Sequence, residues 1–143
     1  MDVKLAFVAD AANDAQGKLN VLGIFDRVNP SEYPYIHPQM CLVVSFEASP
    51  AEFGRTKNIE IMLLDPDARP LSSMKASGKV PKPEAGTQAH FQFILRLVNT
   101  PFPKHGPYEF AILVGGDRKA SIQIEAVPIP KPPRKKRKKA NDN

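Results

Sequence analysis

The chain has 143 residues, with 20 Lys and Arg, 15 Asp and Glu, and a single cysteine. This length fits one domain of roughly 125 to 130 residues and excludes a second hydrophobic core of ordinary size. The lone cysteine excludes an intramolecular disulfide and a zinc site made of thiolates.

The apolar segments are too short for a membrane span and too interrupted for an export signal. No apolar run approaches the roughly 20 residues of a spanning helix. Charges interrupt residues 2–10 every few positions, whereas a signal peptide needs a continuous apolar stretch. We expect a soluble protein that stays in the reducing cytoplasm.

Charge is divided unevenly along the chain. Residues 131–143 hold seven Lys and Arg residues and one Asp, which gives this segment a formal charge of +6. The rest of the chain holds 13 basic and 14 acidic residues and is close to neutral. The excess positive charge therefore belongs to a C-terminal appendage and not to a face of the folded domain.

Turn residues and apolar alternation predict strands from the N-terminus onward. Fifteen prolines and eight glycines separate short runs rich in Val, Ile, Phe and Leu, a pattern typical of a sandwich or barrel. Residues 3–9 predict a first strand, and residues 18–28 predict a second one that pairs with it as a hairpin. The first strand is expected to place Val3, Leu5 and Phe7 on one face.

A proline-rich connection follows over residues 29–38. Its three prolines argue against a central strand. Tyr33, Tyr35 and His37 lie in this loop. Two interpretations stay open, because the aromatic rings could close the end of the core or could line a groove that binds a protein partner.

The middle of the chain predicts a buried strand and one helical turn. Residues 40–47 are almost continuously apolar and include Cys41, which favours a central strand buried on both faces. A serine precedes a proline in residues 49–54 and a glycine ends them, as in a short helical turn. Residues 58–64 alternate as a strand, and residues 65–70 form a turn.

The last third of the domain predicts an edge strand, a core strand and a closing hairpin. The expected elements are an edge strand over 71–79, a loop over 79–86, a core strand over 88–98, a loop over 99–107, and strands over 108–114 and 121–127 joined at 115–118. Two sets of side chains are expected to face the core: Phe91, Phe93, Leu95 and Leu97 in the core strand, and Tyr108, Phe110, Ile112 and Val114 in the hairpin.

Three segments carry a family resemblance. The sequences KLAFVAD (4–10), GKLNVLGIFD (17–26) and HPQM (37–40) resemble an uncharacterised family of small bacterial all-β domain proteins, over roughly residues 3–128. GPYEF (106–110) followed by GGD (115–117) also resembles the last hairpin of immunoglobulin-like sandwiches. The family resemblance implies no assigned activity, so it transfers no functional residue to this chain.

Catalytic and metal-binding motifs do not emerge from the sequence. His37, His90 and His105 are not spaced as a ligand pair. Asp65 and Asp67 could approach a calcium ion, but the rest of a calcium loop is missing and a turn is the simpler interpretation. Phosphate-binding and nucleophile-elbow motifs are lacking too. We expect no cofactor, no metal and no enzymatic activity.

The C-terminal tail is the strongest local signal in the sequence. A proline-rich spacer over residues 127–133 leads into an unbroken run of six basic residues. Such a run should stay extended and attract phosphates without reading base sequence. The predicted nucleic-acid contacts are Lys131, Arg134, Lys135, Lys136, Arg137, Lys138 and Lys139.

These observations predict an all-β antiparallel sandwich, immunoglobulin-like or jelly-roll, of seven to nine strands over residues 1–128. Residues 129–143 are expected to form a disordered basic tail. The leading hypothesis is a non-enzymatic binding or accessory module with an unknown protein partner, whose tail adds non-specific affinity for RNA or DNA. The alternatives are a structural subunit of a larger assembly, which should self-associate independently of the tail, and a hydrolase, which should gather Asp and His residues at one end of the sandwich.

Overall fold

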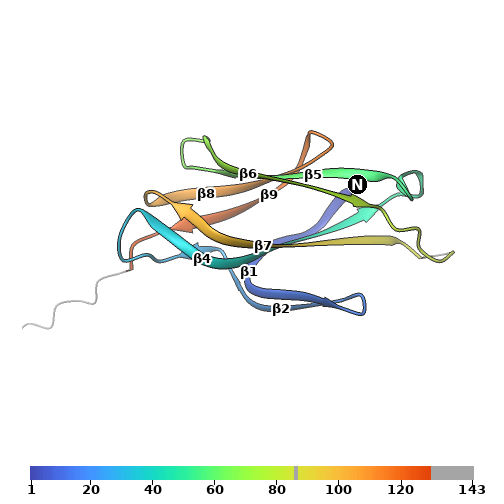
Figure 1. Cartoon of the computed structure of the whole chain (residues 1–143), viewed down its shortest axis with the longest axis horizontal. Coiled ribbons are helices and arrows are strands. Elements are labelled where there is room, and N and C mark those ends of the chain that lie inside the picture. Colours follow the sequence, from blue (N-terminus) through green and yellow to red (C-terminus); the bar gives the residue numbers. More distant parts are fainter. Residues whose placement is uncertain (86, 130–143) are drawn as a thin grey trace, which may run out of the picture.

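The computed structural model describes residues 1–85 and 87–129 and shows two packed β-sheets (Figure 1). Within these residues the strands are β1 (Asp2–Ala15), β2 (Lys18–Phe25), β3 (Arg27–Val28), β4 (Tyr35–Ala48), β5 (Thr56–Leu64), β6 (Pro70–Lys79), β7 (Ala89–Phe102), β8 (Gly106–Val114) and β9 (Asp117–Ala126), with one 3-10 turn, η1 (Pro50–Glu52). This arrangement confirms the prediction of a β-sandwich with seven to nine strands.

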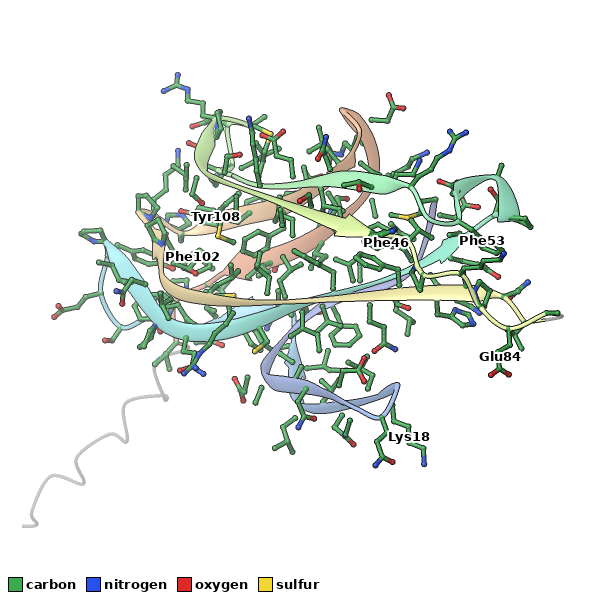
Figure 2. All side chains as sticks on the ribbon, turned by 45° about the vertical axis from the view of Figure 1, so that its right-hand side comes forward. Lys18, Phe46, Phe53, Glu84, Phe102 and Tyr108 are labelled. Carbon is green, nitrogen blue, oxygen red and sulfur yellow. The ribbon has the colours of Figure 1, made fainter. Side chains whose placement is uncertain are left out.

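One sheet has the strand order β2-β1-β4-β7 and the other has the order β3-β9-β8-β5-β6. All neighbouring pairs are antiparallel except β3 and β9, which run parallel. The core lies between the sheets, where Figure 2 shows Phe46, Phe102 and Tyr108. These three side chains are fully buried, because alternate residues of β4, β7 and β8 face the opposite sheet.

Strand β4 contains the longest uninterrupted buried run in the described part of the chain. Every residue from Met40 to Phe46 is buried, and β4 is paired on both sides, with β1 and with β7. Cys41 is a free, buried cysteine in this strand. The prediction of a central strand buried on both faces is therefore confirmed.

The start of β4 corrects the prediction of a loop over residues 29–38. Tyr35 opens the strand, although Pro38 lies inside it. Proline is tolerated at position 38 because β4 pairs with β1 only from Cys41 onward, so no residue of β1 lies opposite Pro38. On the other side the β4–β7 ladder is interrupted opposite Asn99, which has a φ of 54°. Pro38 therefore removes no hydrogen bond from a ladder.

The prediction that Val3, Leu5 and Phe7 share one face of β1 was wrong, because only Val3 among them packs against the core. A register shift between Val3 and Leu5 interrupts the alternation along β1. Val3, Ala6 and Val8 consequently contact the core, while Leu5 is exposed. A bulge that changes which face a side chain occupies leaves no period-two signature in the sequence.

Three further predicted boundaries shift in the structure. The expected strand over 18–28 divides into β2 and β3, and β3 crosses to the other sheet to pair with Glu125 and Ala126. The expected loop over 99–107 shrinks because β7 continues to Phe102. The last turn is only Gly115–Gly116, so β9 begins earlier than predicted.

Strand β1 has two halves with different surroundings. Its first residues pair with β4, whereas its last residues pair only with β2 around the turn Gln16–Gly17. Lys18 marks the tip of this hairpin, which lies outside the two layers of the sandwich (Figure 2). The hairpin is therefore a ribbon that projects from the body.

The η1 turn fixes the other end of β1. The Glu52 carboxylate accepts hydrogen bonds from the Ser49 backbone N–H and hydroxyl, both at 3.1 Å. The same carboxylate pairs with the Met1 α-ammonium at 2.8 Å and with the Lys57 ammonium at 3.1 Å. Hydrogen bonding from the Met1 ammonium is the main reason that the pKa of Glu52 falls to about 2. The predicted helical turn over 49–54 is confirmed as η1.

Candidate partner-binding surface

One end of the sandwich gathers the aromatic residues of the proline-rich segment. The chain passes from β2 through β3 into the segment before β4, and it crosses the end of the core on the way. Tyr33 precedes a cis peptide bond to Pro34. Tyr33 and Tyr35 both pack against the core cluster, so the interpretation that these rings close the core is confirmed.

Tyr33 lies deeper than its loop position suggests. Its hydroxyl is buried, without a hydrogen-bond partner in the described part of the chain. Burial raises the pKa of Tyr33, and the charge of Tyr108 adds to this effect. The Tyr33 ring makes an edge contact with His105, with 6.2 Å between the ring centroids. Tyr33 is thus partly buried, with its hydroxyl group inside the protein.

Tyr35 and His37 form the exposed side of the same cluster. The Tyr35 hydroxyl and His37 Nδ1 are joined by a hydrogen bond of 3.0 Å. The Tyr35 ring stacks on Phe102 at 6.3 Å, and the His37 ring lies 5.7 Å from Phe25. These contacts hold the His37 imidazole in a fixed orientation, because one ring nitrogen is already engaged.

A shallow hollow of about 330 Å³ opens beside this cluster. Besides Tyr35 and His37, its lining includes the oppositely charged Asp10 and Arg27. Arg27 also approaches Glu125 at 4.0 Å on the exposed surface. The remaining lining residues are Gly23, Ile24, Phe25, Val28 and Asn29. The hollow therefore combines aromatic walls with both signs of charge.

Gly23 explains why Asp10 can reach the hollow. Gly23 has a φ of 68°, and a Cβ at this position would overlap the Asp10 carboxylate. Sequence reasoning did not connect Asp10 and Arg27 with the proline-rich segment, because both lie in segments that looked like ordinary strand ends. A glycine inside a strand pattern was the available signal, since it often marks a close approach.

The other candidate residues serve local structure. Asp65 Oδ1 accepts backbone hydrogen bonds from Asp67 at 2.9 Å and from Arg69 at 2.8 Å. The Asp67 carboxylate pairs with the Lys104 ammonium at 2.8 Å, and this hydrogen bond lowers the pKa of Asp67 and raises that of Lys104. Within the described ranges, no group of three His, Cys, Asp or Glu residues could hold a metal ion. No helix in these ranges is long and apolar enough to cross a membrane.

The predicted nucleic-acid contacts, Lys131 and residues 134–139, lie outside the described residues. The last described segment nevertheless shows where the chain leaves the domain. The Val127 backbone N–H donates to the Val28 carbonyl at 3.0 Å, and Val28 lines the hollow. The last described residues therefore lie at the same end of the sandwich as Tyr33, Tyr35 and His37.

Comparison with known proteins adds one finding. Residues 4–127 match the model of a family of unknown function (DUF6941). No curated protein matches the chain.

Proposed function

Because the chain belongs to DUF6941, a family of unknown function, we propose a function from its own residues: it is a non-enzymatic binding module of the cytoplasm whose basic C-terminal segment holds nucleic acid. The separation of charge carries this proposal. Seven of 20 basic residues lie in the last 13 positions, whereas residues 1–130 hold 13 basic and 14 acidic residues. Nucleic-acid affinity should therefore depend on the C-terminal segment alone.

The expected mode of nucleic-acid binding is electrostatic. Residues 134–139 are six consecutive Arg and Lys residues with no aromatic residue among them. Each neutralised phosphate releases counterions, so six contacts predict a loss of affinity of roughly a thousandfold between about 50 and 200 mM salt. Base sequence should have little effect, because phosphate contacts carry no sequence information.

The sandwich end is the proposed surface for a protein partner. Tyr35 and His37 line a hollow together with Asp10 and Arg27, and Tyr33 packs against the core at the same end of the sandwich. Aromatic and Arg side chains are enriched at the centres of protein interfaces. The last described residues lie at this end, so a nucleic acid held by the basic segment that follows them would stand next to the partner.

A binding titration tests the nucleic-acid part of the proposal. We would measure binding of RNA and duplex DNA by the full chain and by a full-length variant with residues 134–139 changed to glutamine. The matched length keeps the domain and the proline-rich spacer intact. The native chain should bind both polymers with a steep salt dependence, and the variant should not bind. Equal binding by both proteins would refute the tail as the binding element.

A hydrolase is the second candidate, because Asp10 and His37 line the same hollow. In the tautomer in which His37 Nδ1–H donates to the Tyr35 hydroxyl, Nε2 carries the free lone pair and is able to accept a proton from water. The test compares native protein with a His37→Ala variant on simple ester and phosphate ester substrates. Turnover that disappears in the variant would favour this candidate over a pure binding role.

A further inference from the structure

The free edge of β2 carries little of the protection that edge strands usually have. β2 pairs with β1 on one side and with no described strand on the other. Leu22 is 72% exposed and Ile24 is 63% exposed, and Lys18 is the only charged residue in the strand. Proteins usually protect such edges with charges, prolines or covering segments, because an open edge pairs with another chain.

The tight turn of the hairpin determines which backbone groups face the free edge. A two-residue turn closes on a hydrogen-bonded pair, which here is Ala15 and Lys18. Pairs alternate along an antiparallel ladder. The even-numbered residues of β2 therefore bond to β1, whereas Leu19, Val21 and Phe25 turn their backbone groups outward. Gly23 departs from the extended conformation, with a φ of 68°.

We propose that β2 pairs antiparallel with β2 of a second copy of this chain, around a two-fold axis at Leu22. This register places Leu22 opposite Leu22 and Asn20 opposite Ile24. Leu19 then forms a hydrogen-bonded pair with Phe25, which the two-fold axis repeats, and Val21 lies opposite Gly23. The two Leu22 side chains meet at a non-hydrogen-bonded position, where the strands bring side chains closest together.

Charge complementarity supports a second copy as the occupant. The same register places Lys18 opposite Asp26 of the other copy, and the two-fold axis repeats this pair. Both residues are exposed in the single chain. No like charges face each other across this ladder, because Lys18 is the only charged residue of β2.

The shape of the molecule also leaves room for the second copy. A hollow of about 410 Å³ lies where β2 ends, and its lining includes Ile24, Phe25, Asp26 and, from β9, Ser121 and Gln123. In the proposed dimer the hairpin tip of the partner reaches this hollow, because Lys18 comes opposite Asp26. The dimer would join the two four-stranded sheets into one continuous sheet.

The interface is small, so the dimer should be reversible. Residues 18–26 of each copy span roughly 30 Å at about 3.4 Å per residue. An interface of one strand edge lies at the lower end of the size range for specific complexes. We expect a dissociation constant on the order of micromolar.

The first test measures the mass of the full chain against concentration by sedimentation. Nuclease treatment beforehand prevents nucleic acid on the C-terminal segment from bridging two copies. The native chain should shift from monomer to dimer, and Leu22→Glu should weaken the dimer more than about tenfold, because two carboxylates meet at the axis. Val98→Glu is the matched control, since Val98 is 62% exposed on β7 at the opposite edge of the sheet.

A monomer at every concentration would overturn the proposal, as would a dimer that Val98→Glu weakens as much as Leu22→Glu does. A charge exchange tests the register itself. Lys18→Glu alone and Asp26→Lys alone should each weaken the dimer, and the double variant should restore it. A double variant that remains as weak as the single variants would show that Lys18 and Asp26 do not meet.

Trapping a covalent dimer tests the position of the axis. Two cysteines at Leu22 would place their Cα atoms about 4.5 Å apart, within the range for a disulfide. Leu22→Cys should therefore form a covalent dimer on mild oxidation, and Val98→Cys should not. Equal cross-linking of the two variants would indicate random collision and would contradict the proposed axis. Neither variant changes the residues proposed to bind nucleic acid. A failure of the dimer proposal would therefore leave the nucleic-acid proposal untouched, and the reverse also holds.

Discussion

Two hairpins of this chain share the same local design and have opposite surroundings. The β1–β2 and β8–β9 hairpins both close on two-residue turns with positive φ angles, Gln16–Gly17 and Gly115–Gly116. β8 and β9 contribute Tyr108, Ile112 and Ile124 to the buried core, whereas β2 leaves Leu22 and Ile24 exposed. Local sequence thus specifies a hairpin, but the packing partner decides whether it stabilises the fold or offers a surface.

The edges of the two sheets show the same contrast. β6 is the outer strand of one sheet and carries Pro70, Lys75 and Lys79 together with three serines. Charged and proline residues on an edge oppose pairing with another chain. β2 has none of these features beyond Lys18. The molecule therefore protects one edge and leaves another available.

The largest expected effect comes from truncating one side chain in each hairpin. Ile112→Ala should lower the free energy of unfolding by about 2 to 5 kcal/mol, because the lost side chain leaves a cavity in the core. Leu22→Ala should change it by less than about 0.5 kcal/mol in the monomer, because Leu22 is already in solvent. Urea unfolding at low protein concentration measures both values. Similar losses for the two variants would mean that the projecting ribbon is part of the core.

A smaller effect is expected where β1 is anchored. Glu52→Gln should lower the free energy of unfolding by about 2 to 3 kcal/mol at neutral pH, given the fall in the pKa of Glu52 from 4.5 to about 2. The sign follows from linkage: a lowered pKa stabilises the folded state above pH 4.5, and this contribution disappears as the pH falls through 2. The difference between native protein and variant should therefore shrink in acid.

The anchoring experiment needs a free α-amino group, because the Met1 ammonium pairs with Glu52. Protein without an N-terminal extension is the appropriate material. Glu84→Gln serves as the matched control, since Glu84 is exposed in a loop. A constant difference between native protein and Glu52→Gln from neutral pH down to pH 2 would contradict the proposed ion pairs.

The sequence predicted the strands of the core well, because burial on one face imposes a period of two. Alternation placed Tyr108, Phe110 and Ile112 on the core face, as the structure confirms. It failed at Leu5, where a register shift exchanges the two faces. The expectation of a loop around Pro38 was also wrong, because β1 does not pair with β4 at that position and the strand can include a proline. These outcomes depend on contacts between segments far apart in the chain, which periodicity does not encode.

The candidate surface was predicted only in part, for a related reason. Tyr33, Tyr35 and His37 stood out in a proline-rich segment. Asp10 and Arg27 join them only because Gly23 leaves room for the Asp10 carboxylate and β3 crosses to the second sheet. A crossing between sheets leaves no local pattern, so a sequence can indicate one side of such a surface and not the whole of it.

The smallest effect is expected from replacing one glycine in each of the two hairpin turns by alanine. Gly116→Ala should lower the free energy of unfolding by about 1 kcal/mol, because Gly116 has a φ of 87° that a side chain disfavours. Gly17 has a φ of 78°, and neither glycine has a neighbour that a Cβ would meet. The local strain is therefore similar in the two variants. The global effect should nevertheless be smaller for Gly17→Ala, because an isolated two-stranded ribbon is only marginally stable and can open without unfolding the domain.

Amide hydrogen exchange distinguishes these two outcomes, since it reports opening at each residue. Gly17→Ala should accelerate exchange at Asn20 and Leu22, which bond to β1, and should leave exchange in β8 unchanged. Gly116→Ala should accelerate exchange throughout the core, because β8 and β9 open only when the domain unfolds. Equal acceleration of the core by both variants would show that the ribbon and the sandwich unfold as one unit. In that case the edge of β2 would already be rigid in the monomer. Pairing with a second copy would then cost less conformational entropy, because fewer residues would become ordered on binding.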